Sequence, residues 1–307
     1  MQEHWTAKNI PDQSGRVIII TGTNSGIGFE TAKELARRGA QVVLACRTLE
    51  KGEQAAARLR TEIPQASLQP MALELGSLAS VRAFADAFRT QFGRLDVLIN
   101  NAGIMMTPYG KTTDGFEQQF GVNHLGHFAL TGLLIDLLTS GSRVVNVSSL
   151  AHCQGVMDFD NLMYEQGGYN PSSAYQRSKL ANLMFTLELQ RRLEAAGMPS
   201  IAVAAHPGVS YTNLARYMLK GFTARLAAPL FRLLTQSTEM GALPTLRAAT
   251  DPQAQGGQYF GPGGRREIRG YPVVVQFVDA ARDPQVARRL WEVSEKLTGV
   301  SFLPLPA

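Results

Sequence analysis

Short runs of apolar residues alternate with amphipathic segments along most of the chain. Continuous apolar runs, several rich in β-branched residues, predict buried strands at 16–21, 41–45, 67–75, 95–100, 143–148 and 200–206. Apolar positions at helical spacing predict helices at 26–38, 49–60, 77–91, 113–138 and 174–196. Strands that are apolar throughout are buried on both faces, as in parallel sheets. The alternation therefore predicts an α/β fold, a doubly wound parallel sheet with helices on both faces.

No low-complexity linker divides the 307 residues, so we expect a single domain over 1–307. Residues 1–14 form a lead-in, and 150–174 and 210–240 are two variable segments. The second is apolar on one face with basic residues interspersed. It suits a packing helix pair, a lid over a lipophilic substrate or a surface that contacts a membrane.

Composition and charge narrow the function classes. The formal charge is +5 and the pI about 9.3, but the basic residues are scattered, and only Arg265, Arg266 and Arg269 cluster. No aromatic ladder accompanies them, so nucleic-acid binding is disfavoured, and a small basic excess suits an anionic cofactor. Two cysteines give neither a disulfide framework nor metal spacing, which favours a reducing compartment. The first residues lack the apolar region of a signal peptide, and no apolar run is long enough for a transmembrane segment, so we expect a cytoplasmic protein.

The first predicted strand is followed by the sequence TGTNSGIG, which places glycines at 22, 26 and 28. Glycines between a strand and a helix permit a tight turn and a close approach of the backbone to a pyrophosphate, which then lies at the helix N-terminus. A glycine-rich turn without a ligand is the alternative.

The end of the second strand reads Ala45-Cys46-Arg47, where an NAD site has an acidic residue for the ribose hydroxyls. A guanidinium in its place can pair bidentately with a 2′-phosphate. Unless Arg47 is merely a surface residue, the cofactor is NADP(H).

Residues 172–182, SSAYQRSKLAN, place Tyr175 and Lys179 four positions apart, on the same face of a helix. A nearby ammonium favours the phenolate and lowers the pKa of a tyrosine, which fits it for acid–base work. An exposed tyrosine that leans on a lysine stem is the alternative.

Taken together, these motifs resemble the short-chain dehydrogenase/reductase family over most of the chain. The matching motifs are T-G-x-x-x-G-x-G at 21–28, N-N-A-G at 100–103, asparagine at 123, V-S-S at 147–149, Y-x-x-x-K at 175–179 and P-G at 207–208. The stretches IPDQSGR, ACRTLEKGE, VSSLAH and HPGVSYTNL are more similar to the retinol-dehydrogenase-like branch and its bacterial relatives.

The resemblance implies a role for each matching catalytic position. Tyr175 is expected to be the general acid/base, and Lys179 to lower its pKa and bind the nicotinamide ribose. Ser149 is expected to hold the substrate oxygen, and Asn123 to anchor a water that links Lys179 to solvent. Asn123 as a plain helix-kink residue and Ser148 in place of Ser149 remain open, because adjacent residues at a strand end are easily confused.

The resemblance also implies the cofactor contacts. Asn101, Ala102 and Gly103 are expected beside the adenosine ribose, Glu74 and Leu75 beside adenine, and Pro207 to Val209 with Thr212 over nicotinamide and phosphate. The expected cofactor residues are Gly22, Asn24, Ser25, Gly26, Ile27, Gly28, Arg47, Glu74, Leu75, Asn101, Ala102, Gly103, Tyr175, Lys179, Pro207, Gly208, Val209 and Thr212.

For the histidines and Cys153 we expect structural roles. We interpret His124, His127, His152 and His206 as packing or loop residues, since no carboxylate spacing makes them metal ligands, and Cys153 as a loop thiol. Ser149 and Tyr175 are 26 residues apart, about twice the usual family separation, so the intervening loop is long. We expect apolar residues of the two variable segments to line a substrate pocket: Met157, Phe159, Leu162, Met163, Leu214, Met218, Phe222 and Leu226.

The resemblance implies an NADP(H)-dependent oxidoreductase that interconverts a lipophilic alcohol and its aldehyde or ketone. Two alternatives stay open at this point: a reductase of a C=C bond in a tetrapyrrole-like substrate, and a non-catalytic NADP-binding regulatory or interaction protein. The expected partner is a small lipophilic carbonyl or alcohol substrate, with no nucleic acid and no metal. Peripheral membrane contact is compatible with the sequence, as is either a monomer or a homo-oligomer.

Overall fold

The computed structural model describes residues 4–209 and 235–302. These residues contain a central eight-stranded sheet. Its strand order is β3-β2-β1-β4-β5-β6-β7-β8. The bounds are β1 (Val17–Thr21), β2 (Gln41–Cys46), β3 (Leu68–Ala72), β4 (Leu95–Asn100), β5 (Leu138–Val147), β6 (Ile201–Ala205), β7 (Tyr259–Pro262) and β8 (Pro272–Val275). All neighbours from β3 to β7 are parallel, which confirms the doubly wound α/β fold.

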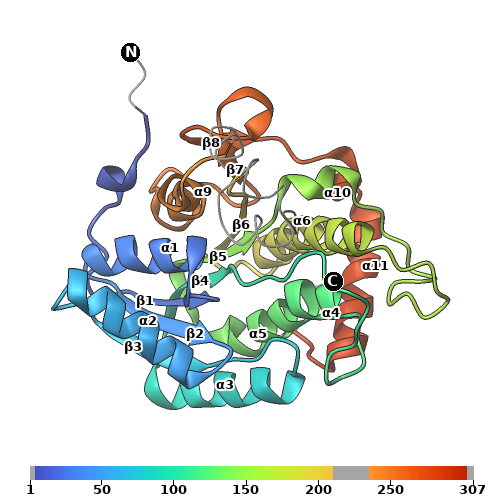
Figure 1. Ribbon diagram of the computed structural model, residues 1–307, viewed down its shortest axis with the longest axis horizontal. Helices are drawn as coiled ribbons and strands as arrows, with labels where there is room; N and C mark the ends of the chain where they lie inside the picture. The colour runs from blue at the N-terminus through green and yellow to red at the C-terminus, as the bar shows by residue number, and fades with distance from the viewer. Residues whose placement is uncertain (1–3, 210–234, 303–307) are drawn as a thin grey trace, which may run out of the picture.

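Helices cover both faces of the sheet (Figure 1). Helices α1 (Gly26–Arg37), α2 (Leu49–Glu62) and α9 (Thr238–Thr250) pack their apolar residues on one face. Helices α3 (Leu78–Gln91), α5 (Gly126–Leu134) and α6 (Pro171–Ala195) pack on the other, and α11 (Pro284–Thr298) adds Trp291 to that cluster. Two further short α-helices of the described residues are α4 (Gln118–Phe120) and α10 (Asp279–Arg282). No helix within the described residues is both long and apolar enough to cross a membrane.

The structure differs from the sequence-based expectation in three places. Strand β8 runs antiparallel to β7, so the sheet is mostly rather than wholly parallel. Neither β7 nor β8 was predicted, because each has only four residues and carries a proline. The single helix expected over 113–138 is interrupted by a π-helical turn over Gly121–Leu125, and β5 already begins at Leu138.

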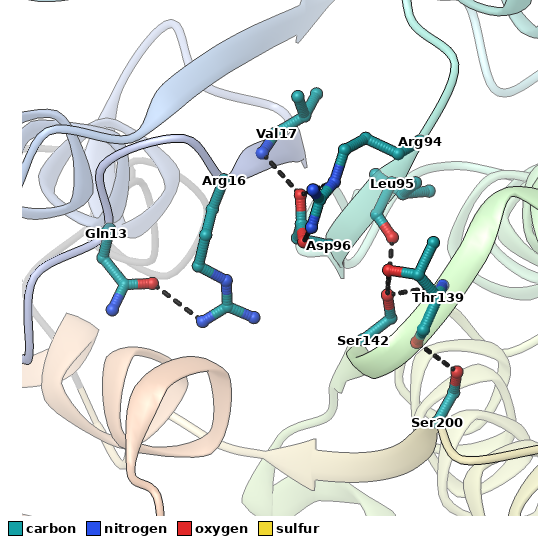
Figure 2. A network of polar contacts seen from close by, with 9 residues as sticks. All are labelled: Gln13, Arg16, Val17, Arg94, Leu95, Asp96, Thr139, Ser142 and Ser200. Carbon is teal, nitrogen blue, oxygen red and sulfur yellow. Dashed lines mark hydrogen bonds and ion pairs between the residues drawn. The ribbon is translucent and has the colours of Figure 1, made fainter.

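Polar contacts tie together the amino ends of the central strands (Figure 2). The buried Asp96 carboxylate accepts a hydrogen bond from the backbone N–H of Val17 at 2.8 Å and forms an ion pair with Arg94. Further side-chain contacts join Ser142 to Leu95, Thr139 to Ser142, Ser200 to Thr139 and Arg16 to Gln13. These contacts lie at the amino ends of the strands, whereas ligands of open parallel sheets bind in the crevice beyond the opposite, carboxyl ends.

Candidate active site

The glycine turn between β1 and α1 needs its glycines. Gly22 and Gly26 have φ of +75° and +63°, in the left-handed region that side chains disfavour. A Cβ on Gly28 would lie 2.5 Å from the Asn101 amide nitrogen and 2.5 Å from the Gly22 carbonyl oxygen. The turn therefore brings its backbone close to β4 and presents the N-terminus of α1 to the crevice.

A cavity of about 530 Å³ lies over this turn and reaches Tyr175. Thirteen of the expected cofactor residues line it: Gly22, Asn24, Ser25, Gly26, Ile27, Gly28, Arg47, Glu74, Leu75, Asn101, Ala102, Gly103 and Tyr175. An elongated anionic dinucleotide fits these residues. The N-terminus of α1 and the Arg47 cation suit its phosphates, and the Tyr175 phenol lies at the other end of the cavity. Thr212 lies outside the described residues.

Two basic residues line the cavity wall, of which the sequence analysis predicted only Arg47. Arg47 forms an ion pair with Glu74, with Nε 2.9 Å from a carboxylate oxygen, and both side chains are substantially exposed. Lys51 lines the same cavity and was missed. The available signal was its position four residues after Arg47, in the first turn of α2, whose N-cap Thr48 accepts the Lys51 N–H.

The loop after β4 is bound to the end of β1. The backbone N–H groups of Asn101 and Ala102 both donate to the Thr21 hydroxyl at 2.9 Å, and the Asn101 side chain donates to the Thr21 carbonyl at 2.7 Å. A Cβ on Gly103 would lie 3.4 Å from the Lys179 ammonium and 3.3 Å from the Asn123 side-chain oxygen. The N-N-A-G stretch therefore joins the glycine turn to the Tyr–Lys helix.

Helix α6 aims Tyr175 and Lys179 at the same region. The helix begins at Pro171 after its N-cap Asn170, whose side chain accepts the N–H groups of Ser172 and Ser173. The buried Lys179 ammonium donates to the Val147 carbonyl at 3.0 Å and lies 5.7 Å from the centre of the Tyr175 ring.

The charge states differ from the expectation that Lys179 lowers the pKa of Tyr175. Burial raises the pKa of the tyrosine above its ordinary value, and a hydrogen bond with the Ser149 side chain offsets only part of that rise. Burial also lowers the pKa of Lys179 to about 8. Desolvation penalises both charged forms here, so the protein alone holds Tyr175 as a neutral phenol.

The two adjacent serines face different partners. The Ser148 hydroxyl is buried and donates to the Lys179 carbonyl at 2.8 Å, which fixes β5 against α6. The Ser149 side chain instead makes the hydrogen bond with Tyr175 and caps the short helix Leu150–Gln154. Of the two, Ser149 is placed beside the phenol.

Asn123 lies within the π-helical turn Gly121–Leu125, where its side chain and its backbone carbonyl bind different elements. Its side-chain amide binds the backbone of Ile104, accepting at 2.8 Å and donating at 2.9 Å, and also donates to the Ser178 hydroxyl at 2.9 Å. Its backbone carbonyl accepts from the His127 ring at 3.0 Å. The side chain thus ties the β4 loop to α6, and π-turns of this kind are frequent at functional sites.

Residues Pro207 to Val209 follow β6 in a tightly packed bend. Gly208 has φ of +61°, and a Cβ there would lie 2.4 Å from the Ile268 carbonyl oxygen. The Val209 N–H donates to that same carbonyl, and the Gln236 side chain donates to the Pro207 carbonyl at 2.7 Å. None of the three lines the cavity just described, which does not extend over β6.

The described apolar residues of 150–174 do not line the cavity beside Tyr175. Leu162 belongs to a hydrophobic cluster with residues of α6 and α11, and Met157, Phe159 and Met163 pack against it. Arg177 fixes this loop by donating to three of its carbonyls, those of Val156, Asn161 and Leu162.

Arg177 lies two residues from both Tyr175 and Lys179 and so points to another side of α6. The expected pocket residues Leu214, Met218, Phe222 and Leu226 lie outside the described residues. The apolar side chains that share the cavity with Tyr175 include Ile104, Met105 and Val122, which the sequence interpretation missed. The signal was their position directly after N-N-A-G and next to Asn123.

Residues 16–221 match the family model of the short-chain dehydrogenases, and the chain belongs to that family. Its relatives include retinol dehydrogenase 13 of Homo sapiens, 45% identical over 293 residues that cover 93% of this chain and 85% of that protein. Retinol dehydrogenase 14 of Homo sapiens is 44% identical over 307 residues, with 93% and 87% covered. The resemblance to the retinol-dehydrogenase-like branch is confirmed, and the chain is an oxidoreductase of a family that uses a nicotinamide cofactor.

Solved structures agree with the fold. A protein from Mycobacterium paratuberculosis superposes with a TM-score of 0.83 at 45% identity, covering 98% of this chain and 100% of that one. The NADP complex of RhlG from Pseudomonas aeruginosa gives a TM-score of 0.62 at 24% identity, with 80% and 94% covered, a likeness of fold alone.

Proposed function

We propose that the protein is an NADP(H)-dependent oxidoreductase that interconverts a lipophilic alcohol and its aldehyde or ketone, with Tyr175 as the general acid/base. The observation that carries the proposal is the cavity that runs from the glycine turn and Arg47 to Tyr175. The family uses a nicotinamide cofactor, which transfers hydride, and the Tyr175 phenol at the end of the cavity can transfer a proton. Together these two groups support chemistry at a carbonyl.

The choice of NADP(H) rests on charge. Arg47 and Lys51 both line the cavity near the end of β2, where an acidic residue would bind an NAD ribose. A guanidinium binds a phosphate bidentately and an ammonium adds a second charge. Glu74 already pairs with Arg47 and thereby keeps the guanidinium at the cavity wall.

The acid–base step follows from the charge states of the site. A bound nicotinamide cofactor would supply the hydride for reduction and take it up in oxidation. In reduction the neutral Tyr175 donates its proton to the carbonyl oxygen, and in oxidation its phenolate accepts the alcohol proton. Ser149 donates a hydrogen bond to the same substrate oxygen and stabilises its developing charge. With its pKa near 8, Lys179 is mostly charged at neutral pH and favours the phenolate as it forms.

The substrate class rests on the apolar atoms beside Tyr175 and on the relatives. Ile104, Met105 and Val122 provide a surface on which an apolar substrate is buried. The relatives reported above are named retinol dehydrogenases, which act on a lipophilic alcohol by their name.

A turnover screen tests the proposal. Purified enzyme is assayed with NADPH and with NADH against a retinal, a steroid ketone, an aromatic aldehyde and a quinone. Tyr175→Phe measures the background. We expect NADPH-dependent reduction of at least one apolar carbonyl compound, and no substrate turned over above the Tyr175→Phe background would overturn the proposal.

A further inference from the structure

His127 occupies the first turn of α5 and is almost wholly buried, with 2% of its surface exposed. Its two ring nitrogens have different partners. Nδ1 lies 3.0 Å from the Asn123 carbonyl oxygen, and Nε2 lies 2.9 Å from the Thr21 hydroxyl. One imidazole therefore joins the π-helical turn to the residue that precedes Gly22.

The donors and acceptors of this contact fix the tautomer. A carbonyl only accepts, so Nδ1 carries the hydrogen. Burial, with a smaller contribution from the nearby Lys179 charge, lowers the pKa of His127 to about 4, so the ring is neutral and Nε2 is an acceptor. Thr21 must then donate to Nε2.

The Thr21 hydroxyl is saturated by this arrangement. It has one hydrogen and two lone pairs, and the lone pairs accept the N–H groups of Asn101 and Ala102. The other acceptor in its reach is the Ile99 carbonyl at 3.4 Å, which is longer than the 2.9 Å to His127. The imidazole thus orients the hydroxyl so that both lone pairs face the β4 loop.

We propose that His127 is a positioning residue that sets the glycine turn, the β4 loop and the π-helical turn relative to one another without touching substrate or cofactor. Its Nε2 contact acts on the cofactor side through Thr21, Asn101 and Ala102. Its Nδ1 contact acts on the proton-transfer side, because Asn123 holds Ile104 and Ser178 beside Lys179.

Two conservative variants separate the contacts. In His127→Asn the amide nitrogen replaces Nδ1, which keeps the bond to the Asn123 carbonyl and loses Thr21. In His127→Gln the amide oxygen replaces Nε2, which keeps Thr21 and loses Asn123. His124→Gln is the matched control, since His124 is equally buried on the preceding turn but binds Ser294 of α11.

Amide hydrogen exchange of the cofactor-free protein tests the placement itself. We expect faster exchange at Asn101 and Ala102 in His127→Asn, by about three- to tenfold, and unchanged exchange there in His127→Gln and His124→Gln. Equal exchange at these amides in all three variants would overturn the proposal.

Cofactor binding and turnover give the second readout, which rests on the proposed function. We expect His127→Asn to raise the Kd for NADPH about three- to tenfold, and His127→Gln to lower kcat with a smaller change in Kd. Losses identical to those of His124→Gln would mean a merely structural role. If the wild type neither binds NADPH nor turns over a carbonyl compound, the proposed function fails, while the exchange pattern still decides the role of His127.

Discussion

The Arg47 guanidinium and the Glu74 carboxylate form an ion pair of 2.9 Å just beyond the carboxyl ends of β2 and β3. The other Glu74 oxygen accepts the backbone N–H of Gly76 at 2.9 Å, so the carboxylate is fixed and orients the arginine. A 2′-phosphate that binds here gains Arg47 as a partner and meets Glu74 as a like charge.

This pair gives a prediction about cofactor choice. Arg47→Ala should raise the Kd for NADPH by about ten- to a hundredfold and leave the Kd for NADH little changed, because the lost charge-assisted contact is made only to the 2′-phosphate. Glu74→Gln should tighten NADPH by a few fold at low salt by removing the like charge. Fluorescence titration with both cofactors measures the effect, and a wild type that prefers NADH would contradict it.

Tyr175→Phe keeps the ring and removes the transferable proton. Turnover should fall by at least about a hundredfold, whereas NADPH binding should stay within a few fold of wild type. Steady-state kinetics and a binding titration on the same preparation separate the two. Near-normal turnover in this variant would remove Tyr175 from the mechanism.

Lys179 predicts a pH dependence of stability. Its pKa is about 8 in the folded protein against 10.5 ordinarily, so between these values the unfolded chain binds more protons. This group therefore makes the free energy of unfolding rise as pH increases from about 8 to about 10.5, because the cost of the buried ammonium disappears.

The test compares melting temperatures of wild type and Lys179→Met from pH 7 to 10. The Tm of wild type should improve relative to the variant across that window. Lys51→Met removes an exposed lysine instead, and the difference in Tm between wild type and this variant should not grow across the window. A difference between wild type and Lys179→Met that is constant with pH would count against a depressed pKa.

Met105 predicts substrate selectivity. Met105→Ala removes apolar surface beside Tyr175 and should raise KM for bulky apolar substrates by about tenfold, with less effect on small carbonyl compounds. Met163→Ala is the control, because Met163 packs against the cluster of α6 and α11 and should lower Tm without discriminating between substrates. Equal losses for large and small substrates would assign Met105 to packing alone.

Several features of this protein follow from the sequence itself. The β-branched run of β1, the glycines after it and the four-residue spacing of Tyr175 and Lys179 depend on local geometry. Strand period, helix period and the demand for glycine at positive φ act over a few residues, so each is readable along the chain.

The tertiary structure decided what depends on residues distant in sequence. In the folded chain Arg47 forms an ion pair with Glu74, the Ser148 hydroxyl donates to the Lys179 carbonyl, and the Ser149 side chain binds Tyr175. The tertiary structure also raised the pKa of Tyr175 where the local Tyr–Lys pairing predicted a lower one, because burial is a property of the whole packed chain. Short strands such as β8 and the orientation of each polar group likewise depend on the neighbours that folding supplies, since hydrogen bonds and desolvation act through space rather than along the sequence.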